Sequence, residues 1–143
     1  MKTLFFLVLC AVFTACNAPT PEYQNEKLVR QMFEAFNRHD WKAMAEFYTD
    51  TAEFLDPGYG NEYMRKSRGE TAAKYTEMQN MFPDLHDEVV TLFSNGDKVA
   101  VEFISTGTAN GEKFNLPIST VFTIANGKIV KDATYYNNCQ EKQ

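Results

Sequence analysis

The octapeptide TAEFLDPG, residues 51–58, predicts a short β-strand that ends on a carboxylate. Phe54 and Leu55 supply its apolar side chains, and a Pro-Gly pair stops the strand directly after Asp56. An acid in this place is either a turn former, because Asp side chains bond nearby backbone, or a functional group. Helical patterns precede the strand and hairpin patterns follow it, so it joins the two halves of the chain.

Three segments show the 3.6-residue apolar period of amphipathic helices. The pattern predicts helices over residues 22–38, 41–48 and 70–82. Asp40 is a suitable N-cap for the second helix, and Pro83 follows the end of the third. The short break between the first two helices indicates a helical hairpin.

From residue 85 onward the apolar period changes from 3.6 to 2, which indicates strands. Three Asn-Gly pairs, beginning at Asn95, Asn110 and Asn126, lie between runs rich in Val, Ile, Phe and Thr. Asn-Gly is a strong hairpin signal because both residues tolerate positive φ. The predicted antiparallel strands cover about 85–94, 98–108, 113–124 and 128–137. With the strand near 51–56, they predict an α+β domain whose curved, cone-shaped antiparallel sheet wraps around the N-terminal helices and leaves a cavity for a small ligand.

The first residues are typical of an export signal. A positively charged start precedes an apolar run over 4–13, which is too short to span a bilayer, and FTAC at 13–16 resembles a bacterial lipobox. That resemblance implies cleavage before Cys16 and lipidation of its thiol, which would anchor the exported protein to a bacterial membrane on the periplasmic or cell-surface side. An ordinary secretory signal cut at a nearby Ala is the alternative. The predicted segments are a signal peptide at 1–15, a tether at 16–24, one domain at 25–138 and a tail at 139–143.

Composition restricts the function classes. Cleavage before Cys16 removes 15 of the 143 residues and leaves 128, which suits one domain. The net charge of −5 and the lack of a basic stripe argue against nucleic acid as a partner. Cys139 would be the sole free thiol, so no structural disulfide is expected. We expect no metal and no cofactor, because the His and Asp residues lack metal-ligand spacing and no phosphate-binding loop is present.

Five stretches carry a family resemblance: FEAFNRHDW at 33–41, FYTDTAEFLDP at 47–57, FPDL at 82–85, GDKVAV at 96–101 and NGKIV at 126–130. The chain resembles the SnoaL-like and ketosteroid-isomerase-like branch of the nuclear transport factor two superfamily. That superfamily hosts isomerases, cyclases, dehydratases, epoxide hydrolases and non-enzymatic binders. The resemblance therefore implies a fold more strongly than an activity.

The resemblance implies a role for Asp56. In ketosteroid isomerases the general base is an Asp followed by Pro at the end of the first strand, and the spacing from Asp40 places Asp56 there. A partly buried carboxylate with raised proton affinity would take a proton from carbon beside a carbonyl and return it elsewhere. The family's oxyanion donors, a Tyr and a protonated Asp, correspond to Met32 and to a position on or near Ser119. Met32 departs from the family pattern, because its side chain cannot donate a hydrogen bond.

The last predicted strand offers a second carboxylate. Strand alternation places Val130, Asp132, Thr134 and Tyr136 on one face, which the resemblance directs toward the cavity. Asp132 and Asp56 in one apolar pocket would have their pKa values pushed apart, giving an acid and a base. If the register slips by one residue, Asp132 would instead pair with Lys on the outer face.

Two functions remain open from the sequence. The first is a cofactor-free isomerase, cyclase or dehydratase for a hydrophobic carbonyl or polyketide-like compound, with Asp56 as base and with Asp132, Tyr136 and Ser119 as acid or hydrogen-bond donors. The second is a non-catalytic protein that holds a hydrophobic small molecule near the membrane, or a module that dimerises through its open sheet face. The predicted ligand-binding residues are Met32, Tyr59, Ser119, Thr134 and Tyr136.

Two further positions carry alternatives. Tyr59 follows Asp56 in a loop that would form a lid or mouth for the cavity, or else a solvated loop. His86 is expected to be a surface histidine among Asp84, Asp87 and Glu88, with a proton carrier as the alternative.

Overall fold

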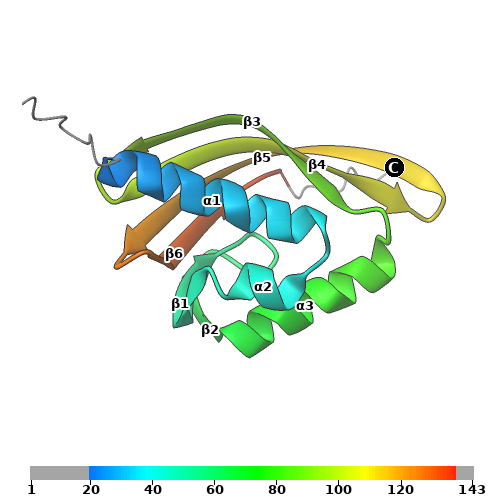
Figure 1. The fold of residues 1–143 in the computed structure, drawn as a ribbon. Helices are drawn as coiled ribbons and strands as arrows, with labels where there is room; N and C mark the ends of the chain where they lie inside the picture. Colours follow the sequence, from blue (N-terminus) through cyan, green and yellow to red (C-terminus); the bar gives the residue numbers. More distant parts are fainter. Residues whose placement is uncertain (1–19, 138–143) are drawn as a thin grey trace, which may run out of the picture.

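The computed structural model describes residues 20–137, which form three helices and one six-stranded sheet (Figure 1). The predicted signal peptide, Cys16 and Cys139 lie outside the described residues. The helices are α1 (Pro21–Asn37), α2 (Trp41–Ala45) and α3 (Arg68–Met81). The strands are β1 (Tyr48–Leu55), β2 (Met64–Ser67), β3 (His86–Asn95), β4 (Lys98–Ala109), β5 (Glu112–Ala125) and β6 (Lys128–Tyr135). The α+β prediction is confirmed.

The helix ends follow from local chemistry. Thr20 caps α1 by accepting a hydrogen bond from the backbone N–H of Tyr23 at 3.3 Å, and Pro21 occupies the first turn. Residues 21–24, expected in the tether, therefore form the first turn of α1. α3 begins with a capping box between Ser67 and Glu70. No helix within residues 20–137 is long and apolar enough to cross a membrane.

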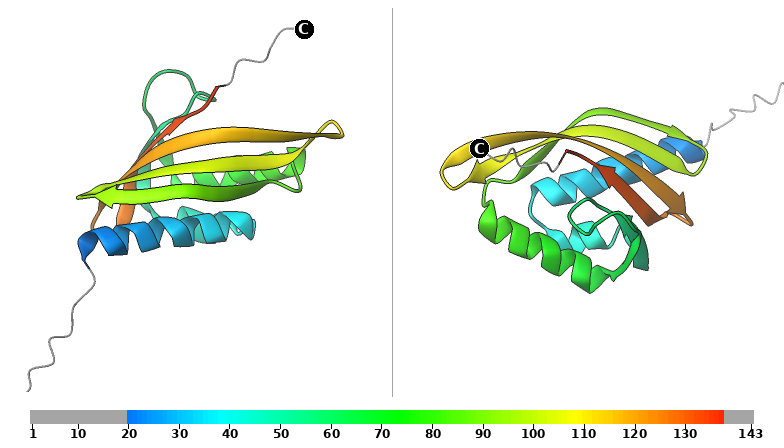
Figure 2. Two further views of the ribbon diagram at one scale, coloured as in Figure 1. Left: turned by 90° about the horizontal axis from the view of Figure 1, so that it is seen from above. Right: turned by 180° about the vertical axis from the view of Figure 1, so that it is seen from behind.

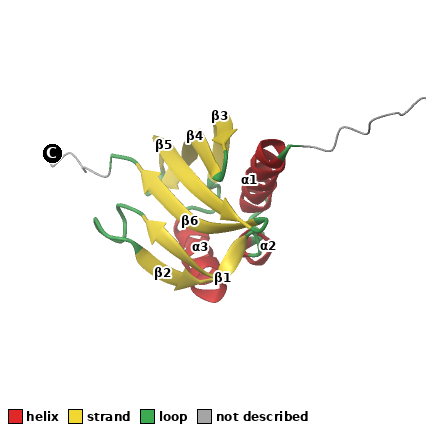
Figure 3. Ribbon diagram, turned by 90° about the vertical axis from the view of Figure 1, so that its left-hand side faces the viewer, coloured by secondary structure: helices red, strands yellow, loops and turns green. Residues whose placement is uncertain are grey.

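The sheet has the strand order β2-β1-β6-β5-β4-β3, which Figure 3 shows from one side. The three predicted hairpins join β3 to β6 in succession, and Asn110 and Asn126 adopt positive φ at their turns. Two features differ from the prediction. β1 pairs with β6 in parallel, so the sheet is mixed, and β2 lies in the stretch expected to be a loop. β2 is a short edge strand with no buried residue, so it carries no apolar alternation to predict it.

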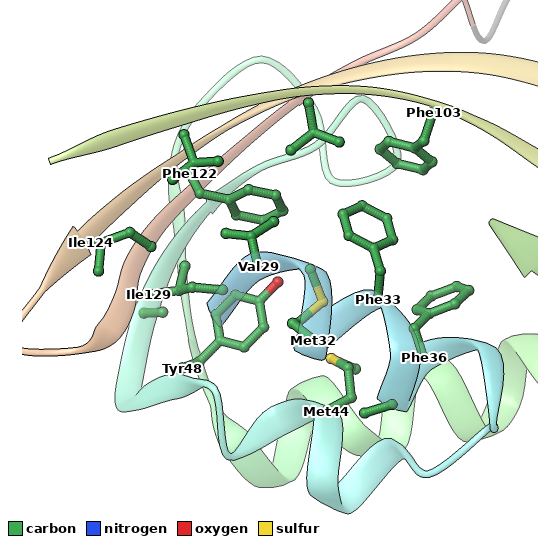
Figure 4. Packing of buried hydrophobic residues seen from close by; sticks show 14 of the residues in the cluster. Val29, Met32, Phe33, Phe36, Met44, Tyr48, Phe103, Phe122, Ile124 and Ile129 are labelled. Atoms are coloured by element: carbon green, nitrogen blue, oxygen red, sulfur yellow. The ribbon is translucent and has the colours of Figure 1, made fainter. Parts of the chain in front are cut away.

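The hydrophobic core lies between the helices and the concave side of the sheet. Figures 1 and 2 show the sheet arching over all three helices. Val29 and Phe33 of α1 pack toward Phe122 and Ile129 of the sheet, and the ring of Phe33 meets that of Phe103 edge-on at 4.9 Å (Figure 4). This packing fixes the long strands over α1 and leaves space nearer α3.

Candidate active site

A cavity of about 700 Å³ lies between the helices and the concave face of the sheet. Its size is typical of small-molecule sites. Its apolar wall includes Met32, Phe33, Phe36, Met44, Met78, Phe82, Leu85, Phe103, Phe114, Leu116, Ile118 and Phe122. Its polar wall includes Tyr48, Lys74, Tyr75, Asp87, Ser105, Asn115, Thr120, Asp132, Thr134 and Tyr136. The stripe of Met32, Phe36 and Met44 is therefore both core and cavity lining.

Asp132 is a buried carboxyl in the cavity wall, with 6% of its surface exposed. The Tyr48 hydroxyl donates to its Oδ2 at 2.8 Å, and the Thr134 hydroxyl donates to its Oδ1 at 2.8 Å. Thr120 Oγ1 lies 2.8 Å from Thr134 Oγ1 and continues this relay. Burial raises the pKa of Asp132 above its ordinary value, although the hydrogen bonds from Thr134 and Tyr48 and the charge of Lys74 oppose the rise. Asp132 therefore holds a proton to higher pH than an exposed aspartate does.

A bulge in β6 sets which residues face the cavity. The β5–β6 pairing shifts between Thr123 and Ile124, which leaves Val130 without a pairing partner. Ile129 before the bulge and Asp132 after it consequently both face inward. Thr134 and Tyr136 follow on the predicted face and line the cavity, whereas Val130 does not.

Asp56 is a turn former and ion-pair partner, and it is not part of the cavity wall. Its Oδ2 accepts from Lys74 Nζ at 2.7 Å. Its Oδ1 accepts from the Gly58 backbone N–H at 2.7 Å and from the Tyr136 hydroxyl at 3.0 Å. Burial raises the pKa of Asp56, but the charge of Lys74 and these hydrogen bonds outweigh it, so the pKa is lowered overall. The prediction of a base with raised proton affinity is wrong, because the ion pair with Lys74 helps to lower the pKa of Asp56. The prediction that Asp56 and Asp132 open on one cavity is wrong, because Asp56 does not line it.

Lys74 and Tyr75 bring α3 into the site, and the sequence analysis missed both. Burial lowers the pKa of Lys74, but its neighbour Tyr75 and the Asp56 carboxylate outweigh it, so Lys74 stays charged. Lys74 Nζ lies 4.5 Å from the ring centroid of Tyr59. Tyr59 is half-buried and does not line the cavity, whereas residues 60–63 of the same loop are exposed, as the alternative of a solvated loop predicted.

Tyr75 is a hydrogen-bond donor candidate inside the cavity. Burial raises the pKa of its hydroxyl, the carboxylates of Asp132, Asp56 and Asp87 raise it further, and Lys74 opposes them. The hydroxyl therefore stays protonated at neutral pH. Tyr75 lines the cavity within the electrostatic influence of carboxyls from β3, β6 and the end of β1.

The remaining predicted residues fall into two groups, those that line the cavity and those that are exposed on the surface. Met32 lines the cavity and cannot donate a hydrogen bond. Ser119 is exposed on the far side of β5, so its predicted place in the site is wrong, and its neighbour Thr120 is buried in the cavity wall instead. His86 is exposed, which confirms a surface histidine.

Asp87 is buried and lines the cavity, although it was expected among surface acids. Asn37 at the end of α1 holds its backbone, donating to the Asp87 carbonyl at 2.8 Å and accepting from its N–H at 2.9 Å. Burial raises the pKa of Asp87 to about 7 against the hydrogen bond of Ser105, its cross-strand neighbour. The alternation of Leu85, Asp87 and Val89 along one strand face was the signal that could have found it.

The model of the SnoaL-like domain family matches residues 29–131. The chain belongs to this family. A search of curated proteins found no match.

Solved structures share the fold of this SnoaL-like chain. IdmH from Streptomyces antibioticus, a proposed polyketide cyclase, is 22% identical over 80% of this chain and 93% of its own, with a TM-score of 0.71. A ketosteroid isomerase-like protein from Catenulispora acidiphila, solved with trimethylamine, is 19% identical over 84% of this chain and 88% of its own, with a TM-score of 0.70. A SnoaL-like protein of unknown function from Burkholderia thailandensis is 25% identical over 84% of this chain and all of its own (100%), with a TM-score of 0.68.

Within residues 20–137, no group of three or more acidic, His or Cys side chains is arranged to hold a metal ion.

Proposed function

We propose that this SnoaL-like protein is a cofactor-free enzyme that moves a proton on a hydrophobic carbonyl compound, with Asp132 as the general base. The observation that carries the proposal is the buried carboxyl of Asp132 in the wall of an apolar cavity. Burial makes its ionised form a stronger base than an exposed carboxylate. Tyr48 and Thr134 fix its orientation by donating to separate oxygens.

The proposed reaction balances without a cofactor. The Asp132 carboxylate takes a proton from the carbon beside a carbonyl, and the C–H electron pair moves to give an enolate. Tyr75 donates a hydrogen bond to the enolate oxygen, and the positive charge of Lys74 lies close enough to act on Asp132. The enolate then recovers the proton at another carbon, as in an isomerisation. In a cyclisation its carbon instead attacks a second carbonyl of the same molecule, the C=O π pair moves to oxygen, and the resulting alkoxide takes the proton back from Asp132.

The relatives support a polyketide-like substrate. IdmH and a Jannaschia protein of the same fold, 21% identical to this chain, are each described as proposed polyketide cyclases. The aromatic and methionine wall of the cavity suits an aromatic or polycyclic ligand of that kind.

Proton–deuterium exchange at carbon tests the proposal on a panel of cyclic ketones in heavy water. Native protein should catalyse exchange, and Asp132→Asn should lower the rate by roughly a hundredfold or more. Asp56→Asn is the comparison variant, because it removes the other predicted carboxylate, which lies outside the cavity wall and acts on the cavity only through its partners Lys74 and Tyr136. Exchange that depends on Asp56 and survives Asp132→Asn would overturn the assignment.

A second function, a non-catalytic binder, also has support. Both oxygens of Asp132 already accept hydrogen bonds, and the family's oxyanion tyrosine position holds Met32. Ligand binding by native protein without any exchange, and with unchanged affinity in Asp132→Asn, would identify a binder.

We also propose that the protein is exported and anchored to a bacterial membrane through lipid on Cys16, as the FTAC stretch indicates. Mass spectrometry of the membrane fraction should find Cys16 as a lipidated N-terminus, and an unlipidated one would refute this.

A homodimer through the outer sheet face is a further proposal, supported by exposed Val90, Phe93 and Tyr135. Light scattering should give twice the mass of one chain.

A further inference from the structure

Asp87 is a buried acid for which the proposed reaction has no use. Its side chain is 6% exposed, and its Oδ1 has no hydrogen-bond partner among the described residues. Buried polar atoms are nearly always paired, so an orphaned carboxyl oxygen calls for an explanation. Asp87 lines the same cavity as Asp132, and the missing partner can therefore come from a ligand.

The site around Asp87 is held in place from both sides. Asn37 makes two hydrogen bonds to the Asp87 backbone, at 2.8 and 2.9 Å, which fix β3 against the end of α1. Ser105, directly opposite on β4, lowers the pKa of the carboxyl and is itself buried. The backbone of Asp87 is therefore fixed, and its side chain is buried with Oδ1 unpaired among the described residues.

Asp87 and Asp132 lie at different ends of the cavity. Asp132 is on β6 and Asp87 is on β3, with β5 and β4 between them. Three strand spacings correspond to about 14 Å across the sheet. The pairing also offsets the two residues along the strands, because Asp132 is in register with Val99 of β4 and Asp87 with Ser105, six residues further on, which adds roughly 20 Å along the strands before the arch of the sheet shortens the direct path. Rings of Phe33, Phe36 and Phe103 gather between the helices and the sheet (Figure 4) and line this space. A single small ring would not reach from one carboxyl to the other, so a ligand that meets both ends of the cavity has to be elongated.

We infer that Asp87 is a ligand-anchoring residue that binds a hydroxyl group at the end of an elongated, fused-ring molecule, opposite the end that meets Asp132. This inference rests on the proposed use of the cavity for a hydrophobic ligand. A hydroxyl fits better than a carbonyl or an ether, because it can donate to the carboxylate and can also accept from the protonated acid. A site built to bond a hydroxyl rejects the analogue that lacks it, since the buried polar group is then left unpaired.

A matched pair of fluorescent probes tests the inference without any chemistry. 1-Hydroxypyrene and 1-methoxypyrene share four fused rings and differ in whether they can donate a hydrogen bond. Native protein should bind 1-hydroxypyrene more tightly by roughly tenfold to a hundredfold in a fluorescence titration. Asp87→Leu should abolish the preference, and Asp87→Asn, whose amide can still accept, should keep part of it.

Glu88→Gln is the control, because it removes a carboxylate from the exposed side of the same strand. It should keep the full preference. Equal affinities in the native protein, a preference that survives Asp87→Leu, or no binding of either probe would each overturn the inference. Asp132→Asn separates the two proposals, since it should abolish exchange on ketones and leave the probe preference intact. Near-ultraviolet circular dichroism of each variant confirms that the fold is retained.

Discussion

Replacing Asp87 by Asn should make the protein more stable at alkaline pH than the native chain. The pKa of Asp87 is raised by burial from an ordinary 3.8 to about 7, so the folded state binds the proton more tightly than the unfolded state does. Raising the pH from about 4 to 7 therefore pulls the equilibrium toward unfolding, and the stability that the proton confers is lost by pH 7 and above. Asn carries no proton to lose and escapes this penalty.

The size of the effect follows from the two pKa values. Each pKa unit corresponds to about 1.36 kcal/mol, so the interval from 3.8 to about 7 sets an upper limit of about 4 kcal/mol. Between pH 5 and pH 8 the expected change is about 3 kcal/mol, since part of the interval lies below pH 5. The free energy of unfolding of the native chain minus that of Asp87→Asn should fall by this amount over the same range.

Urea denaturation of both proteins at several pH values from 5 to 9 measures the difference. Taking the difference cancels other titrations, including Asp132, whose pKa is also raised, and Asp56, whose pKa is lowered and which acts in the opposite direction. Glu88→Gln controls for the loss of one negative charge. A native-minus-variant difference that stays flat from pH 5 to 8 would refute the burial argument for Asp87.

Three other changes have defined outcomes. Lys74→Met removes the partner of the lowered-pKa carboxylate Asp56, so it should cost about 1–3 kcal/mol in urea denaturation at pH 7, and the loss should shrink as the pH falls below 3.8 and through the lowered pKa of Asp56; a loss that stays constant down to acid pH would contradict the ion-pair argument. Tyr48→Phe removes the hydrogen bond that holds the pKa of Asp132 down, so the pH profile of ketone exchange should move to higher pH, and an unmoved profile would exclude Asp132 as its base. Thr120→Val removes one hydroxyl of the Asp132 relay and should cost about 1 kcal/mol in urea denaturation; no loss would show that the relay adds nothing to stability.

The fold could be predicted where its causes are local. The Asn-Gly pairs at 110 and 126 adopt the positive φ that hairpins need, and the sequence shows this directly. The parallel pairing of β1 with β6 joins strands about eighty residues apart, as in the pair Tyr48 and Ile129, and no turn residue signals it. The polar edge strand β2 gives no burial pattern, so its sequence predicts a loop instead of a strand.

The site was harder to predict because its meaning depends on partners from distant elements. Asp56 occupies the expected position, yet Lys74 on α3 converts it from a base into an ion-pair partner. Asp87 sits among charged neighbours that suggest a surface, while Asn37 on α1 fixes its strand so that the side chain turns inward. In both cases the role of the strand residue is decided by a contact from a helix, so the sequence of the strand alone does not reveal it.

The charges around the cavity limit where an enolate could form. Lys74 is the sole cationic side chain among the described residues that line the cavity, and Asp56 already neutralises it in part. A developing negative charge near Asp87 would have no cationic side chain of the cavity wall beside it and, above a pH of about 7, would meet an ionised carboxylate of its own sign. Near Asp132 it would lie within the influence of Lys74 and of the protonated Tyr75 hydroxyl. Proton transfer from carbon therefore belongs at the β6 end of the cavity, and the β3 end is suited to holding a neutral hydroxyl.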